Sequence, residues 1–420
     1  MSSKKEEASV TQKARRSLVP ALRFPEFRDA GEWEEGKIYS LFKVDKKPEK
    51  ASKFDSEKII TVKLHANGVV KNERAGTLTG GANYYKRRAN EFIFSKIDLL
   101  NGAFGLVPDD LDGFCSSSDV PAFAFKEDSI PLFFLDWLKV NYQNLPIERT
   151  GTSSTLKRVA PSKFLELPIQ LPSKVEQQKI ADCLSSIDDL ITLEARKIEA
   201  LKAHKKGLMQ QLFPAEGEKI PKLRFPEFRD AGEWEKKTIG SVCRIFSGGT
   251  PVTSRRSFYG GDIPFIRSAE IDKTRTELFL TQEGLDNSAA KLVVKGDLLL
   301  ALYGANSGDV AMAKVDGAIN QAILCLRSEC SNAFIYHSLS HMQSEIVFSY
   351  VQGGQGNLSG DIVKSIELYF PSQNEQQKIA DCLSSIDDLI SLQARKLEAL
   401  NAHKKGLMQQ LFPVSNEVRR

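Results

Sequence analysis

Apolar residues recur at alternating intervals of three and four along two stretches of the chain, 172–214 and 371–413. Each stretch begins and ends at a proline. Such spacing gathers the apolar side chains on one stripe and predicts a long helix with a coiled-coil seam in each stretch. The predicted seam residues are Ile180, Leu184, Ile187, Ile191, Ile198, Leu201 and Leu208 in the first helix and Ile379, Leu383, Ile386, Ile390, Leu397, Leu400 and Leu407 in the second.

Polar residues interrupt both seams. Glu194 and Gln393 take d positions near the middle of each helix, and Lys205 and Lys404 take a positions near the ends. If the two helices bury their seams against each other in antiparallel directions, Glu194 and Gln393 fall at about the same level. A polar pair there would specify the register of the pairing. The alternative is that both side chains reach solvent past the seam.

The two predicted helices are near-copies, both containing EQQKIADCLSSIDDLI, and a second repeat, LRFPEFRDAGEWE, occupies 22–34 and 223–235. The segments between the repeats do not resemble each other. This pattern predicts one frame built twice that holds two different modules. The predicted parts are a charged tail 1–21, a first domain 22–171, a first spacer helix 172–214, a linker 215–222, a second domain 223–370, a second spacer helix 371–413 and a C-terminal tail 414–420.

Each module has short β-prone runs, an apolar helical stretch, a loop rich in glycine or serine, and a last strand before the long helix. The predicted strands are 58–64, 91–97, 103–107 and 165–171 in the first module and 263–267, 292–302, 319–327 and 362–370 in the second. The predicted module helices are 131–142 and 333–351. We therefore predict two mixed α/β (α+β) domains separated by two long antiparallel coiled-coil helices.

The order of the repeats predicts a circular arrangement. After the first long helix the chain continues through LFP and a linker into LRFPEF, whereas after the second it continues through LFP to the last residue. If the halves are related by a pseudo-twofold axis, the end of the second helix lies beside the first LRFPEF. The position of Phe412 relative to Phe24 should then match the position of Phe213 relative to Phe225.

Composition narrows the class of protein. With 420 residues, 41% hydrophobic and 27% charged, the chain is too long for one ordinary core and has a normal globular composition. We find no apolar run of about 18 residues and no signal-peptide pattern at the N-terminus. Six scattered cysteines favour a reduced, cytoplasmic protein. A net charge of +4 permits a polyanionic partner without requiring one.

Catalytic signatures are missing. The chain has no GxxxxGK[ST] phosphate loop, no HExxH or CxxC, and no Pro-Pro pair of the kind that amino-methyltransferases use to hold a target nitrogen. Cys325, Cys330, His337 and His341 have a spacing that a zinc site could use. The spacer is short for a zinc finger and Cys325 falls in an apolar run, so we favour packing roles and predict no metal and no catalytic residue.

Basic and polar side chains cluster in both modules. Arg suits phosphate and guanine, and Asn or Gln suits adenine, so such clusters can contact DNA, although a charge run is more often a solvated face. The candidate contacts are Tyr84, Lys86, Arg87, Arg88 and Ser153 in the first module and Thr250, Arg255, Arg256, Arg267 and Asn357 in the second.

Together, the two repeats and the motifs SGGTP, IPFIRSAEI, AINQAI, GGQGNLSG, TVKLHANGVV and FIFSKIDLLNGAFGLVP resemble the specificity subunit of type I restriction-modification enzymes. The resemblance implies a non-catalytic subunit in which each variable domain reads one half of a split double-stranded DNA target. It also implies that the paired helices space the two halves and dock two methyltransferase subunits, with restriction and translocase subunits in the full complex. Those partners bind S-adenosylmethionine, ATP and Mg²⁺, and no cofactor is expected on this subunit.

Two other classes remain open from the sequence. One is an endonuclease or methyltransferase with two DNA-binding modules, which a methyltransferase fingerprint would identify. The other is a coiled-coil adaptor that does not bind DNA, which a salt-dependent DNA titration would separate.

Overall fold

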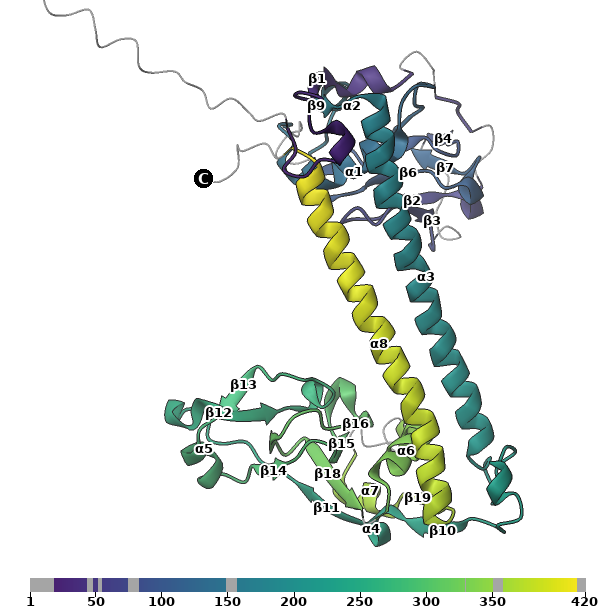
Figure 1. Ribbon diagram of the computed structural model, residues 1–420, viewed down its shortest axis with the longest axis vertical. Helices are drawn as coiled ribbons and strands as arrows, with labels where there is room; N and C mark the ends of the chain where they lie inside the picture. Colours follow the sequence, from purple (N-terminus) through teal and green to yellow (C-terminus); the bar gives the residue numbers. More distant parts are fainter. Residues whose placement is uncertain are drawn as a thin grey trace, which may run out of the picture. The chain divides into compact units, whose positions relative to one another are not determined.

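The computed structural model of the protein describes residues 19–43, 48–51, 55–74, 83–148, 157–328, 330–349 and 358–413. The chain forms two compact units: unit 1 comprises 1–193 and 397–420, and unit 2 comprises 194–396. The predicted first domain belongs to unit 1 and the predicted second domain to unit 2 (Figure 1). Within the described ranges, no helix is both long and apolar enough to cross a bilayer.

Unit 1 is a mixed α/β domain of short strands. The strands are β1 (Glu34–Lys37), β2 (Ile60–Val62), β3 (Val69–Lys71), β4 (Tyr84–Lys86), β5 (Phe92–Phe94), β6 (Phe104–Leu106), β7 (Cys115–Ser117), β8 (Ala122–Phe123) and β9 (Pro168–Leu171). They pair as β1–β9, β2–β3, β4–β7 and β6–β5–β8. The helices are α1 (Pro131–Asn141), α2 (Pro161–Leu165) and α3 (Lys174–Leu212), whose first part belongs to this unit.

Aromatic side chains form the core of unit 1. All three residues of β5 are fully buried, and the ring of Phe92 lies 5.0 Å from that of Phe134 on α1 and 5.7 Å from that of Phe164 on α2. Because each buried ring removes a large apolar area from water, this cluster can hold together a domain whose sheets are small. The predicted helix 131–142 is confirmed as α1.

Unit 2 contains two four-stranded sheets (Figure 1). One has the order β11 (Cys243–Ser247), β18 (Ile323–Ser328), β15 (Leu298–Ala301), β16 (Val310–Met312). The other has the order β13 (Leu278–Leu280), β12 (Tyr259–Ile266), β17 (Gly317–Ile319), β14 (Lys291–Val293). The remaining elements are the β10 (Glu235–Thr238) and β19 (Glu367–Phe370) pair, the helices α4 (Ile239–Val242), α5 (Gln282–Asp286), α6 (Asn332–Ile346) and α7 (Gly360–Ser365), and the first part of helix α8 (Gln373–Leu411).

The predicted strand 292–302 is wrong in one respect, because it is two strands, β14 and β15, that belong to different sheets. A turn separates them: Gly296 has a φ of 91°, which favours glycine, and Asp297 accepts a hydrogen bond from the Val294 N–H at 2.8 Å. An apolar run does not reveal such a turn when strong β-formers flank it on both sides.

Two further predicted strands are also shorter than expected. The run 319–327 is divided between β17 and β18. In the run 362–370 only the last four residues form β19, since Ser359 accepts a hydrogen bond from the Ile362 N–H and starts helix α7. Local capping therefore overrides the strand propensity of the isoleucine and valine in this segment.

Both long helices begin with the same capping arrangement. The Ser173 hydroxyl accepts a hydrogen bond from the Glu176 N–H at 3.3 Å before α3, and Ser372 accepts one from Glu375 at 3.4 Å before α8. A serine followed by a glutamate three residues later is the capping-box pattern. The repeated PSxxE text therefore specifies where each helix starts.

A buried ion pair joins each copy of the LRFPEF segment to the first turn of a long helix. In unit 1, Arg23 makes two hydrogen bonds of 2.7 Å to Glu176. In unit 2, Arg224 makes two of 2.7 Å to Glu375. The side chains of each pair are 7% and 1% exposed. The second repeat is thus structural, because it supplies the cation for a carboxylate that the helix start buries.

In unit 1 the first turns of α3 run antiparallel to the last turns of α8. Ile180 and Leu184 share a core cluster with Leu411. Further along α3, Asp188 forms an ion pair with Lys404, which lies further back along α8. As the position on α3 advances, its partner on α8 recedes, which defines the antiparallel direction.

Unit 2 has the same direction of pairing. Lys205 of α3 forms an ion pair with Asp387 of α8 at 2.6 Å, and Glu194 forms one with Lys396 at 2.7 Å. The predicted antiparallel pairing is therefore confirmed within each unit. None of the predicted seam residues is exposed.

Glu194 does not reach solvent past the seam, so that alternative is wrong for this residue. It is 1% exposed, and its Oε1 accepts hydrogen bonds from Lys396 of α8 at 2.7 Å and from Lys197 at 3.1 Å. These two hydrogen bonds lower the pKa of Glu194. The polar contact at this level therefore joins Glu194 to a lysine, and not to Gln393 as we expected.

The end of α8 lies beside the first LRFPEF segment, as the circular arrangement predicts. The Leu22 N–H donates to the Gln410 carbonyl at 2.9 Å, and Phe24 packs on the cluster that contains Phe412. The equivalent contacts in unit 2 are Leu223 to Gln211 at 2.9 Å and Phe225 on the cluster that contains Phe213. In both units the end of a long helix therefore lies beside an LRFPEF segment, but only in unit 2 does the chain connect that helix end directly to the segment.

We expect circular permutation to be tolerated. In the permuted protein, a copy of the 214–222 segment joins Phe412 to Leu22, and the chain is opened within the original 214–222 segment. The new linker replaces the original one at the equivalent place in the other unit, so none of the contacts above is broken. The unfolding temperature of the permuted protein should stay within about 4 °C of the parent, which corresponds to ~1 kcal/mol. A matched permutant opened within β18 should fail to fold. Equal behaviour of the two permutants in thermal unfolding would contradict the circular arrangement.

Candidate nucleic-acid interface

The predicted contact cluster of the first domain begins on β4. Tyr84 and Lys86 are half-buried there. Arg87 is 3% exposed, and its guanidinium donates to the Ser116 hydroxyl at 2.6 Å and to the Val120 carbonyl at 2.8 Å. Burial lowers the pKa of Arg87. In this structure Arg87 therefore holds β7 and the turn after it.

Arg88, which is exposed, and the half-buried Lys86 share one carboxylate. Glu49 accepts a hydrogen bond of 2.7 Å from each, and these bonds lower the pKa of Glu49. Exposed ion pairs are weak, so a phosphate can replace Glu49 as the partner of either cation. The cluster lines a pocket of about 370 Å³, to which Lys43 and Lys96 also contribute.

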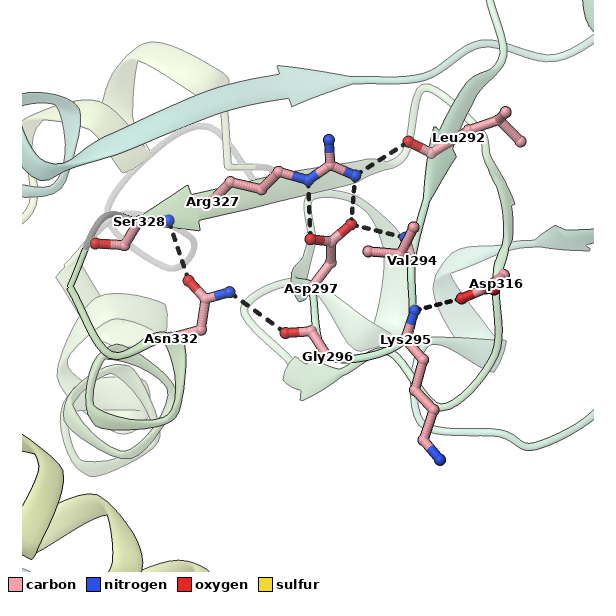
Figure 2. A network of polar contacts seen from close by, with 9 residues as sticks. All are labelled: Leu292, Val294, Lys295, Gly296, Asp297, Asp316, Arg327, Ser328 and Asn332. Atoms are coloured by element: carbon pink, nitrogen blue, oxygen red, sulfur yellow. Dashed lines mark hydrogen bonds and ion pairs between the residues drawn. The ribbon is translucent and has the colours of Figure 1, made fainter.

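In the second domain, one end of the β11–β18–β15–β16 sheet is fixed by side chains, and we call it the tied end (Figure 2). Arg327 of β18 donates to Asp297 at 2.8 and 2.6 Å. Burial acts to raise the pKa of Asp297, but Arg327 and the Val294 N–H outweigh it and lower that pKa. Asn332 links α6 to this end by donating to the Gly296 carbonyl at 3.3 Å. The tied end is therefore structural.

The opposite end of this sheet, which we call the loop end, carries loops. There β11 ends at Ser247, β15 ends at Ala301 and β18 begins at Ile323. Leu302, after β15, donates to the Ala322 carbonyl, before β18, at 2.8 Å. The loops after β11, after β15 and before β18 therefore emerge together.

The SGGTP loop at the loop end requires its two glycines. A Cβ at Gly248 would collide with the Ile319 carbonyl oxygen. A Cβ at Gly249 would lie 2.5 Å from the Cβ of Ala289. Only glycine allows the backbone this close to β17 and the turn before β14. The loop is consequently held in one place against the domain.

Three of the predicted contacts follow these glycines. The Thr250 hydroxyl is exposed and donates to the Gln321 Oε1 at 2.6 Å. Arg255 and Arg256 are both exposed, and the Arg255 guanidinium lies 5.3 Å from the centre of the Phe258 ring. A cation held over a ring keeps its outer N–H groups available to a phosphate.

The remaining candidates are placed differently. Arg267 donates to Glu270 at 2.9 Å and to Glu277 at 2.5 Å, so its charge is already paired. Ser153 and Asn357 lie outside the described residues.

Two exposed residues at the loop end were missing from the sequence-based candidates. They are Gln321, the partner of Thr250, and Tyr303, which is 42% exposed in the loop after β15. Gln321 belongs to the AINQAI motif quoted above, but a single glutamine in an apolar context gives no chemical signal. Only the strand register brings it to Thr250.

The cysteine and histidine residues with zinc-like spacing are packed side chains. Cys325 is buried in β18, where burial raises the pKa of its thiol to about 12. The His337 Nε2 lies 3.1 Å from the Ser384 hydroxyl, and the His341 ring stacks at 5.4 Å on Phe213. Across the part of the chain that the structure describes, no group of three or more His, Cys, Asp or Glu side chains could hold a metal ion.

Comparisons with known proteins agree with the repeated frame. The family model of the type I restriction modification DNA specificity domain matches residues 30–203 and again 231–402. A Methanocaldococcus jannaschii protein named as the MjaX specificity subunit of a type I restriction enzyme is 30% identical over 262 residues, 60% of each chain. The EcoR124I/EcoR124II specificity subunit of Escherichia coli is 28% identical over 169 residues, 38% of this chain and 42% of its own. The chain thus spans well under the full length of these relatives.

Solved structures show the same fold. The crystal structure of the type I restriction-modification S subunit from M. genitalium superposes with a TM-score of 0.62 at 18% identity, covering 95% of this chain and 100% of that one. The two matched segments of the family model together span most of the sequence, one in each half of the repeated frame. The chain therefore belongs to the type I restriction-modification DNA specificity family.

Proposed function

We propose that this protein is the DNA sequence-recognition subunit of a type I restriction-modification complex. Each domain reads one half of a bipartite double-stranded target, and the paired helices dock methyltransferase subunits. The half-sites are centred roughly one helical turn apart, on the order of 10 bp, so that both domains meet the same side of the duplex. The bases between the half-sites are not read.

The observation that carries this proposal is a repeated frame around two unlike domains. The frame repeats key contacts, including the Arg23–Glu176 and Arg224–Glu375 pairs and the Asp188–Lys404 and Lys205–Asp387 pairs between the long helices. Apart from the matching pairs β1–β9 and β10–β19, the domains inside it differ: unit 1 carries two- and three-stranded sheets, whereas unit 2 carries two four-stranded ones. A frame of constant geometry with exchangeable inserts suits a protein that presents two independent readers to one partner.

The charge of the loop end supports a polyanionic ligand. Residues 247–257, which include the SGGTP loop, contain Arg255 and Arg256 and neither Asp nor Glu. Both arginines are exposed. Arginine contacts to phosphate supply much of the affinity of proteins for DNA, and they position the protein before bases are read.

Docking of a partner in two copies is supported by a repeated apolar surface on the long helices. Leu190 and Leu193 of α3 are 46% and 47% exposed, and their copies Leu389 and Leu392 of α8 are 48% and 53% exposed. Leucines one turn apart form a small apolar patch on each helix. The same patch twice fits two copies of one partner, the methyltransferase subunit.

Catalysis belongs to the partners in this proposal. The methyltransferase subunits bind S-adenosylmethionine, and the restriction and translocase subunits use ATP and Mg²⁺. This chain recognises the target sequence in the DNA and contributes no catalytic residue. We expect the complex to work in the cytoplasm, where its DNA is found.

Exchange of one domain tests the proposal. Residues 36–171 are replaced by the corresponding segment of another family member, and the methylated sequences are read by methylome sequencing of cells that also express the methyltransferase. One half-site should change completely, while the other half-site and the spacing stay the same. The wild-type chain is the matched control.

Two results would refute the proposal. A change in both half-sites would show that the domains are not independent readers. If the methylated sites in the wild-type control shared no bipartite sequence, this chain would not be the subunit that recognises the target. In a separate titration of purified protein, DNA affinity should fall steeply with salt, since phosphate contacts release counterions.

A further inference from the structure

Three exposed side chains, Thr250, Gln321 and Tyr303, lie at the loop end of the second domain, and we call them the row. In the β11–β18 pairing, Ser247 lies opposite Leu324. Continued for three residues beyond the strands, this register sets Thr250 opposite Gln321. The Thr250 hydroxyl donates a 2.6 Å hydrogen bond to the Gln321 Oε1, which shows that these two side chains meet at the loop end.

The third member of the row comes from the strand on the other side. The β15–β18 pairing also continues past its strands, because the Leu302 N–H donates to the Ala322 carbonyl at 2.8 Å. The next pair in this register is Tyr303 and Gln321. Gln321 lies in the turn before β18, and the pairing of Leu302 with Ala322 brings the exposed Tyr303 to the same end of the sheet.

The row is rigidly mounted. On the Thr250 side, the backbone cannot move away, because Gly248 and Gly249 are packed against β17 and the turn before β14. The residue after Thr250 is held as well, since the Tyr259 hydroxyl donates to the Pro251 carbonyl at 2.8 Å. A reading element needs such support, because base discrimination depends on angles that a mobile loop does not keep.

The hydrogen bond from Thr250 orients the amide of Gln321. Its Oε1 accepts from the threonine and keeps a second lone pair, and within the described residues its Nε2 donates to no other group. An amide that offers one acceptor and one donor side by side matches adenine, which presents its N6 amino group and N7 in the major groove.

We propose that the row Thr250–Gln321–Tyr303 is the base-reading element of the second domain and that Gln321 reads an adenine. Thr250 is a positioning residue, and the exposed ring of Tyr303 packs beside the same base pair. This inference rests on the proposed function and adds the residue and the base to it.

The surroundings of the row favour DNA over a cationic or neutral ligand. Residues 247–257 and 320–322 contain no Asp or Glu, and the one acidic residue of the loop after β15, Asp309, accepts hydrogen bonds from Asn306 and Gln343. Arg255 and Arg256 lie in the same loop as Thr250 and are exposed, so phosphate contacts flank the reading residue. At the tied end, by contrast, the acidic side chains are engaged by the protein itself, since Asp297 pairs with Arg327 and Asp316 accepts a hydrogen bond from the Lys295 N–H (Figure 2).

Methylome sequencing of a Gln321→Ala variant tests the assignment of the base. One position of one half-site, an adenine in the wild type, should become relaxed, with the preference at that position falling roughly 5- to 150-fold. The matched control is Gln282→Ala, because Gln282 is exposed on α5 and its amide is bonded within its own helix to Asp286. That variant should methylate the wild-type sequence unchanged.

The role of Thr250 is tested by two substitutions of similar size. Thr250→Val keeps the shape but has no donor, and it should relax the same position as Gln321→Ala by a smaller factor. Thr250→Ser keeps the donor and should retain the wild-type preference. Loss in both variants alike would show that Thr250 only supports the loop and would overturn its role as a positioning residue.

Other outcomes separate this inference from the function on which it rests. An unchanged target in Gln321→Ala overturns the inference and leaves the proposed function intact. A uniform loss of methylation at all sequences assigns Gln321 to the DNA backbone and also overturns it. If Gln321→Ala does not fold, as judged by thermal unfolding, the Thr250→Val and Thr250→Ser pair decides the point. Relaxation in both half-sites would contradict the independent domains themselves.

Discussion

An Arg224→Met variant is expected to lose about 3–5 kcal/mol of the unfolding free energy of unit 2. The substitution leaves the Glu375 carboxylate, which is 1% exposed, buried without its cation. Breaking a buried pair by removing one partner costs this much because the remaining charge is neither hydrated nor compensated. Hydrogen exchange of peptides from the start of α8 and from 223–238 should show the loss of protection.

The repeated frame offers matched controls for this prediction. Arg23→Met removes the equivalent cation in unit 1 and should lower protection at the start of α3, but not at the start of α8. The double variant Arg224→Met, Glu375→Leu removes both charges and should recover much of the stability, since a well-packed apolar pair often replaces a buried ion pair at little cost. A single variant that loses under 1 kcal/mol, or a double variant no more stable than the single, would contradict the prediction.

Acid is expected to destabilise unit 2 through His337. Burial, and then the charge of Lys205, lower the pKa of His337 from 6.5 to about 3. Between these values the unfolded chain binds a proton that the folded protein does not, so the unfolding free energy falls as the pH drops. The slope is up to about 1.4 kcal/mol per pH unit, and lowering the pH from 6.5 to 4.5 should cost about 2–3 kcal/mol from this group.

A His337→Gln variant isolates this effect. The glutamine amide can replace the contact of Nε2 with the Ser384 hydroxyl, which lies 3.1 Å away, but it does not titrate. The difference in unfolding free energy between wild type and variant at pH 7.5 measures the packing cost alone. That difference should shift in favour of the variant between pH 6.5 and 4.5, and a constant difference across this range would show that His337 is not held neutral.

The sequence predicted the frame well because the frame follows from local sequence patterns. A heptad repeat bounded by prolines describes a helix and its buried stripe without reference to the rest of the chain. The near-identity of 172–214 and 371–413 then implied that the two helices bury each other. The order of the repeats implied the closed arrangement in which Phe24 and Phe412 share one core cluster.

Inside the domains, local sequence patterns predicted the strands and the exposed side chains less well. The run 292–302 reads as one strand because both sides of its turn are rich in leucine and valine, and only the pairing partners show two strands in different sheets. The same limit applies to charge. Arg87 stands in a run with Lys86 and Arg88 and reads as a surface cation, yet the fold buries it on Ser116 and Val120.

The sequence by itself determined that this chain is a doubled frame with two unlike inserts, because periodicity and repetition are properties of the chain alone. The tertiary structure decided which polar side chains the fold uses and which remain for a ligand. Arg267 is paired with two glutamates, whereas Thr250 stands beside Gln321, a residue distant from it in the sequence. The physical reason is that strand register, and not sequence distance, sets which side chains are neighbours in a sheet, and register is established only when the strands pair.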